Sequence, residues 1–154
     1  MIKLDKILIP TDFSDFSQQA LQYGLSFCRE YKAKMVLLHV IEDPFYPSTG
    51  GSFGFDMADF FARMQEESDR KMQELIPAAQ QEGLSVERMI TRGTPFLEII
   101  RVAKEEDVDM IVVATHGRTG LAHVLMGSVT EKVVRKAPCP VLVVRKSQHE
   151  FIMP

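Results

Sequence analysis

Two polar stretches of the chain each follow a short apolar run, and both are placed to line a ligand site. The first, PTDFS at residues 10–14, places the carboxylate of Asp12 just past an apolar run. The second, residues 114–131, contains three glycines, and its only arginine is Arg118. Glycine lets backbone approach a bulky group closely, and successive free N–H groups in such a loop form an anion cradle. The second stretch therefore predicts a phosphate site.

The beginning of the following helix strengthens this prediction. The amino end of a helix starting at Ser128 would bring about half a positive charge to the same place. Arg118 could add a cation, although its side chain could equally point to solvent. A purely structural interpretation stays open, because GSVTE is also a capping box in which Ser128 caps and Glu131 follows three positions later. The glycines alone would also justify a turn.

The elements that must position these residues alternate between short apolar runs and helical patterns. Strands are expected at residues 6–9, 34–41, 84–91, 109–114 and 141–144. Helices are expected from Ser14 or Asp15, over residues 57–81 with Pro77 kinking the helix or ending it early, from the Thr94 cap and Pro95, and over residues 128–136. This alternation predicts an α/β fold, with one five-stranded parallel sheet, doubly wound and Rossmann-like, with helices on both faces. In the order 3-2-1-4-5, strands one and four are neighbours, and both polar stretches flank the crevice at their carboxyl ends.

Length and composition set the broad class. The chain has 154 residues, which suits one domain, expected at residues 1–146, followed by a tail at 147–154. The net charge of −3 argues against nucleic acid as a partner, and no apolar run is long enough for a membrane span. The charged start does not read as a secretory signal, and Cys28 and Cys139 form no CxxC motif. A cytoplasmic protein with reduced thiols is expected.

Several of these motifs together resemble the universal stress protein family over residues 2–145. They are PTDFS after the first strand, LLHV in the second, HGRTG and GSV in the second polar stretch, and PCPVLVV at the end. The ATP-binding branch of this family carries the motif G-x2-G-x9-G followed by Ser or Thr. Gly117, Gly127 and Ser128 match it, whereas Ala114 stands where the first glycine belongs. We expect this alanine to weaken binding rather than abolish it, at a higher cost if its φ must be positive.

The resemblance implies a role for each residue of the motif. The backbone of Gly117, Gly127, Ser128 and Val129 would hold the phosphates, with the hydroxyls of Ser128 and Thr130 as further contacts. Asp12 would bind the ribose hydroxyls or approach a divalent metal, while Pro10 and Thr11 shape its loop. Val40 would read adenine through its backbone groups. Mg²⁺ or Mn²⁺ would be held mainly by the phosphates of ATP.

The resemblance also implies an assembly and a role. The last strand, Val141, Leu142, Val143 and Val144, is an apolar edge that a second copy would cover, and members of the family commonly dimerise there. We therefore expect an ATP-binding sensor or regulator of the stress response, active as a homodimer. Two alternatives stay open: a dimeric interaction module that binds no nucleotide, and a slow ATPase.

The remaining candidate residues carry weaker signals. His39 lies inside an apolar strand and is expected to be a core residue, and His116 is expected to hydrogen-bond to backbone. His123 is expected to face solvent, and no histidine belongs to a metal pattern. The aromatic loop at residues 43–56 could cover the adenine, dock on a partner or lack order.

Overall fold

The computed structural model describes residues 1–43, 56–81, 83–118 and 126–145, with only the helical backbone over 76–81. The expectations for the aromatic loop, for His123 and for the tail at 147–154 lie outside these residues. The described part contains five strands and four helices in the alternating order that the sequence predicts.

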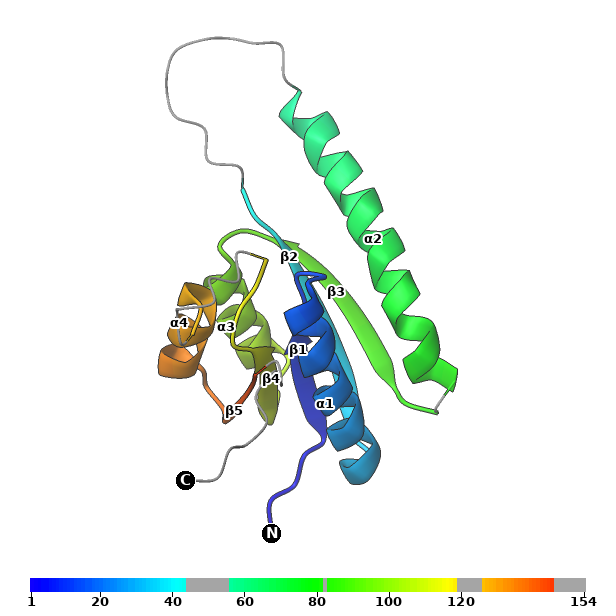
Figure 1. Ribbon diagram of the computed structural model, residues 1–154, viewed down its shortest axis with the longest axis vertical. Coiled ribbons are helices and arrows are strands. Elements are labelled where there is room, and N and C mark those ends of the chain that lie inside the picture. Colours follow the sequence, from blue (N-terminus) through cyan, green and yellow to red (C-terminus); the bar gives the residue numbers. More distant parts are fainter. Residues whose placement is uncertain (44–55, 82, 119–125, 146–154) are drawn as a thin grey trace, which may run out of the picture.

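The strands form one parallel sheet in the order β3-β2-β1-β4-β5, which confirms the predicted topology (Figure 1). The central strand β1 (Lys6–Pro10) pairs with β2 (Lys34–Ile41) on one side and with β4 (Met110–Ala114) on the other. The edges are β3 (Val86–Arg92) and β5 (Val141–Val144). The reversal of strand order therefore falls between β1 and β4, as expected.

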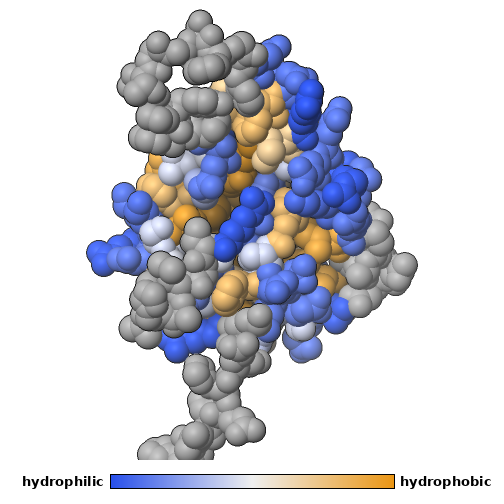
Figure 2. All heavy atoms as spheres, turned by 45° about the horizontal axis from the view of Figure 1, so that its top comes forward, coloured by the Kyte–Doolittle hydropathy of each residue, from blue (hydrophilic) through white to orange (hydrophobic). Residues whose placement is uncertain are grey.

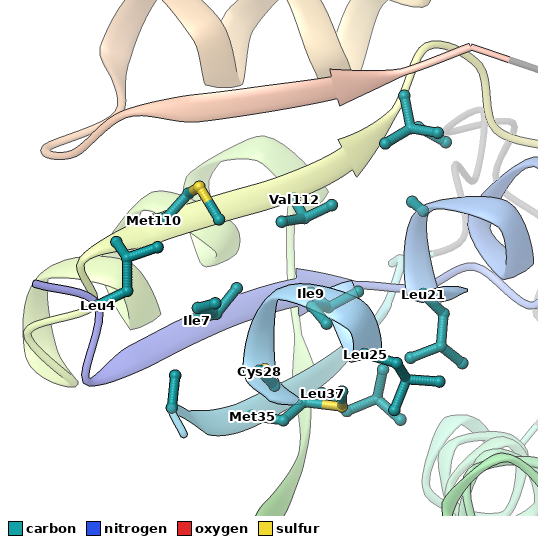
Figure 3. Close-up of a cluster of buried hydrophobic side chains, with 14 of the residues drawn as sticks. Leu4, Ile7, Ile9, Leu21, Leu25, Cys28, Met35, Leu37, Met110 and Val112 are labelled. Atoms are coloured by element: carbon teal, nitrogen blue, oxygen red, sulfur yellow. The ribbon is translucent and has the colours of Figure 1, made fainter. Parts of the chain in front are cut away.

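Helices cover both faces of the sheet. On one face, α1 (Asp15–Tyr31) and α2 (Met57–Gln81) enclose an apolar cluster that includes Ile9, Leu21 and Met72; Figure 3 shows its part around α1 and the sheet. On the other, α3 (Pro95–Glu105) and α4 (Ser128–Lys136) cover a second cluster. The sequences of the buried strands are therefore nearly continuous apolar runs, because successive side chains alternate between two covered faces.

Helix α1 is anchored firmly on β1. Its first turn is capped by Ser14, whose Oγ accepts the N–H of Ser17 at 3.3 Å. Further along, Gly24 packs so closely on the sheet that a Cβ there would overlap the side chain of Ile9. Because β1 and α1 are fixed against each other, the short loop between them has little freedom to move.

Helix α2 spans the predicted residues 57–81 and continues through Pro77, so the expected early end there is wrong and the kink stays a prediction. Pro77 has no N–H to donate to the Gln73 carbonyl. Gly83 follows with φ +73, the left-handed conformation expected of a glycine that ends a helix. Among the described residues, no helix is both long enough and apolar enough to span a bilayer.

Candidate functional site

The two polar stretches meet at the carboxyl edge of the sheet, where β1 and β4 lie side by side. The backbone N–H of Arg118 donates to Asp12 Oδ2 at 2.8 Å, and Arg118 Nε donates to the Asp12 carbonyl oxygen at 2.8 Å. The other carboxylate oxygen, Oδ1, accepts the N–H of Ser14 at 3.0 Å. The Arg118 side chain, left open by the sequence, therefore binds the β1–α1 loop. Figure 2 looks toward this edge and shows hydrophobic residues enclosed by polar ones.

The two motif glycines lie in close contact with their surroundings. A Cβ on Gly117 would lie 2.6 Å from Asp12 Oδ2, and one on Gly127 would lie 3.2 Å from the Thr115 carbonyl oxygen. Gly127 has φ −67, and the described glycines with positive φ are Gly83 and Gly93. A side chain at Gly117 would therefore displace the Asp12 carboxylate, whereas one at Gly127 requires only a small shift, and neither position has a left-handed backbone.

The start of α4 at Ser128 confirms the predicted helix start and contradicts the alternative in which Ser128 is the cap. The N-cap is Gly127, with extended backbone angles, and Ser128 is already the first helical residue. The first bond within the helix runs from the Glu131 N–H to the Gly127 carbonyl at 3.0 Å. The N–H groups of residues 128–130 therefore have no acceptor within α4, as at every helix start. They form an amide cradle with the partial positive charge of the helix end.

The Gly127 amide does not belong to this cradle in the structure. Its N–H donates to the Thr115 carbonyl at 2.7 Å, and this bond joins the two ends of the connection between β4 and α4. The sequence-based role of Gly127 thus changes: it allows the close turn, and the free amides begin at Ser128. Ser128 is exposed, so an accessible hydroxyl lies at the start of the helix.

Thr130 also needs correction as a phosphate contact. Its Oγ1 donates to the Ala114 carbonyl at 2.7 Å, and the residue is only 4% exposed. The hydroxyl therefore joins the first turn of α4 to the end of β4. The reason is geometric, because Thr130 faces the end of β4, whereas Ser128 at the start of the helix is exposed.

Ala114 does not have the unfavourable positive φ that would have raised the cost of replacing the first motif glycine. The described residues other than glycine that have positive φ are Phe13, Lys32 and Asp107, so Ala114 is not among them. Its side chain is 5% exposed and belongs to the apolar cluster beneath α1. The methyl group that replaces the first motif glycine therefore packs in the core.

Val40 lies one residue before the end of β2, which continues to Ile41. The carbonyl of Leu38 accepts the Thr11 N–H at 2.8 Å, whereas that of Ile41 accepts the Gly93 N–H at 3.0 Å on the opposite side. Because peptide groups alternate in direction along a strand, those of Val40 point toward β1. The β1–β2 pairing ends at Pro10↔Leu38, so Val40 lies beyond its last pair.

His39 is a core residue, as expected. It is 4% exposed, and its Nδ1 lies 2.8 Å from the Thr11 carbonyl oxygen. Because a carbonyl only accepts, Nδ1 carries the hydrogen. Burial lowers the pKa of His39 below its ordinary value of 6.5, against the opposing effect of the bond to Thr11.

The other reactive side chains of the described residues lie in separate places. The His116 ring lies 5.5 Å from the ring of Phe16, and its expected bond to backbone is not tested. Cys28 is fully buried, and burial raises the pKa of its thiol to about 11. Over residues 1–43, 56–81, 83–118 and 126–145, no three His, Cys, Asp or Glu side chains are grouped as a metal site.

The sequence did not point to Phe13, which has φ +65 between Asp12 and Ser14. A bulky residue with a left-handed backbone is rare and costs on the order of 1 kcal/mol or more. No sequence signal identifies such a residue, because glycine or asparagine is the usual choice there. Its position beside Asp12 makes it part of the candidate site.

Comparison with known proteins gives a consistent picture. The universal stress protein family model matches residues 3–145. Universal stress protein MJ0577 of Methanocaldococcus jannaschii is 33% identical, over 92% of this chain and 94% of its own. A solved structure described as hypothetical protein MJ0577 superposes with a TM-score of 0.81 at 33% identity, covering 96% of this chain and 100% of that chain.

Two further solved structures contain nucleotides. A universal stress protein in complex with cAMP has a TM-score of 0.71 at 22% identity, over 94% of this chain and 99% of that chain. The universal stress protein of Archaeoglobus fulgidus in complex with dAMP has a TM-score of 0.63 at 20% identity, over 93% and 98%. At these identities the likeness is one of fold.

Proposed function

Because the chain belongs to the universal stress protein family, we propose that it binds an adenine nucleotide, ATP foremost, at the carboxyl edge of β1 and β4. One observation carries the proposal. The amides of residues 128–130 lie at the start of α4 without a partner inside the helix, and Asp12 meets the backbone of Gly117 and Arg118 beside them. We further propose that nucleotide binding serves sensing or regulation in a stress response.

The proposed contacts follow from this arrangement. The phosphates accept hydrogen bonds from the helix-start amides and from the Ser128 hydroxyl. Asp12 accepts from ribose hydroxyls, because its carboxylate lies at the end of β1 next to the cradle. The peptide groups of Val40, beyond the last β1–β2 pair, bind the adenine edge. Adenine nucleotides bound by two universal stress proteins of this fold support the choice of ligand class.

A divalent cation would enter with the nucleotide. Mg²⁺ or Mn²⁺ is commonly held by substrate phosphates with few protein ligands. Asp12 is the carboxylate placed to approach it. Hydrolysis is proposed to be slow at most, because Asp12 already accepts bonds from Ser14 and Arg118 and is poorly placed to activate water.

Calorimetric titration with ATP and Mg²⁺ tests the proposal. We expect a saturable isotherm, with weaker binding of GTP, because the Val40 peptide groups match adenine. A titration without saturation at millimolar ATP would instead favour the interaction module that binds no nucleotide. Phosphate release measured in a single turnover separates binding from hydrolysis.

We also propose a homodimer through β5, an edge strand with partly exposed Val141, Leu142 and Val143. Val143→Lys should shift the protein toward monomer in sedimentation, because a charge on a shared edge opposes pairing. Met89→Lys on β3, partly buried against the same cluster at the opposite edge, is the matched control. A dimer that persists in the first variant would move the interface away from β5.

A further inference from the structure

A buried imidazole lies between the proposed adenine and ribose contacts. His39 precedes Val40 in β2, and its Nδ1 holds the carbonyl of Thr11, the residue before Asp12, at 2.8 Å. The Thr11 N–H in turn donates to the Leu38 carbonyl at 2.8 Å. Thr11 and His39 are 5% and 4% exposed, so water does not readily replace these bonds.

The ring of His39 also contacts Phe13, on the other side of Asp12 along the chain. Their ring centroids are 4.4 Å apart, tilted by 39°, and Lys71 Nζ lies 5.5 Å above the Phe13 ring. The left-handed backbone of Phe13 is unfavourable by itself and persists only where the surroundings impose it. The imidazole of His39 is one part of those surroundings.

Hydroxyl groups fix the rest of this loop. The Phe13 N–H donates to Thr11 Oγ1 at 3.1 Å, and Thr11 Oγ1 lies 3.1 Å from Ser17 Oγ. Ser17 Oγ donates to the Ser14 carbonyl at 2.8 Å. The residues on both sides of Asp12 are therefore held, and the direction of its carboxylate depends on them.

We propose that His39 is a positioning residue that aims Asp12 at the ribose, through the Thr11 carbonyl and the Phe13 ring, and thereby sets the preference for ribonucleotides over 2′-deoxyribonucleotides. This inference rests on the proposed function, in which Asp12 binds the ribose. His39 does not touch the ligand. We expect it to act on the ribose side of the nucleotide, because the amides of residues 128–130 belong to α4 and not to the β1–α1 loop.

The test compares two substitutions of His39. Asparagine retains a donor near the position of Nδ1, whereas leucine leaves the buried Thr11 carbonyl without its partner. Calorimetry with ATP, dATP and tripolyphosphate then separates the ribose from the phosphates. For His39→Leu we expect at least a tenfold loss of ATP affinity, an ATP-to-dATP ratio close to one, and unchanged binding of tripolyphosphate. For His39→Asn we expect a ratio near that of the wild type.

Leu37→Ala is the matched control, because Leu37 is 1% exposed and packs in the cluster beneath α1 from the same strand. It should lower stability and keep the ATP-to-dATP ratio. The inference would be overturned if folded His39→Leu kept the ATP-to-dATP ratio of the wild type, or if Leu37→Ala lowered that ratio equally.

A second measurement does not depend on nucleotide. Hydrogen exchange at the Phe13 amide should be faster in His39→Leu than in Leu37→Ala at matched global stability. Absence of saturable ATP binding by the wild type would refute the proposed function, whereas equal exchange in these two variants would refute the positioning role.

Discussion

The two connections that meet at the carboxyl edge of the sheet are built in different ways. The β1–α1 loop is short, and side chains hold it: hydroxyls of Thr11, Ser14 and Ser17, the carboxylate of Asp12 and the buried ring of His39. The described ends of the β4–α4 connection are held mainly through backbone. There Gly127 donates to the Thr115 carbonyl, and Gly117 allows the approach of Asp12.

In the proposed function, the two connections bind different parts of the nucleotide. Side chains with fixed rotamers suit recognition of ribose hydroxyls, whose positions are specific. Backbone amides at a helix start suit phosphate, which accepts bonds from many directions. Substitutions in the first connection should therefore alter selectivity, and substitutions in the second should alter the affinity for the phosphates.

The largest effect is expected for Gly127→Asp. A carboxylate beside the amides of residues 128–130 would occupy the anion cradle, so ATP binding should become undetectable by calorimetry. The fold should persist, because φ is −67 at this position and a negative charge stabilises a helix start. Gly127→Ala is the control, because it adds the same Cβ 3.2 Å from the Thr115 oxygen without the negative charge. Unchanged affinity in a folded Gly127→Asp variant would place the phosphates elsewhere.

A smaller effect is expected for Gly117→Ala, because Gly117 lies where the two connections contact each other. The new methyl would lie 2.6 Å from Asp12 Oδ2 and displace the carboxylate. ATP affinity should fall about tenfold, or about 1.4 kcal/mol. In an Asp12→Ala background the same change should have little further effect, because the clash is gone. Additive losses in this double-mutant cycle would show that Gly117 acts independently of Asp12.

Thr130→Val should change stability and not affinity. Removing the hydroxyl leaves the buried Ala114 carbonyl unpaired, at a cost of about 1–3 kcal/mol in urea unfolding. ATP affinity of the folded fraction should stay the same, and Thr130→Ser should recover most of the stability. A selective loss of phosphate affinity in Thr130→Val would restore the role first expected from the motif.

The smallest effect concerns pH and His39. Because burial lowers the pKa of His39, the unfolded chain binds the proton more readily than the folded protein. The free energy of unfolding should therefore fall as the pH drops from about 7 through the folded pKa, by at most about 1.4 kcal/mol per pH unit. Urea unfolding of the wild type and of His39→Asn measures the difference. Parallel pH profiles would contradict it.

Much of the fold was predictable because its signals are local. Four apolar runs and one alternating segment predicted the five strands to within two residues at either end, and the alternation with helices predicted one parallel sheet. The expected order of a doubly wound sheet with its first strand near the middle is the one found. His39 was recognised as buried because its neighbours in β2 are apolar. Of the two outcomes expected at Pro77, the early end is wrong, since α2 continues to Gln81.

The candidate site was predictable only in part. The helix start at Ser128 was predicted correctly, but the resemblance assigned the Thr130 hydroxyl to the phosphates, whereas it donates to the Ala114 carbonyl. The rotation of α4 relative to β4 decides which hydroxyl faces the sheet, and composition does not encode that rotation.

The sequence by itself determined the elements, their order and the edge at which two polar stretches must end, because these follow from the periodicity of neighbouring residues. Only the tertiary structure decided that Asp12 binds the Arg118 amide, 106 residues away, that Phe13 adopts a left-handed backbone, and that Thr130 faces Ala114. Such contacts depend on how packed elements sit against each other. That arrangement is settled by the whole core rather than by any one segment.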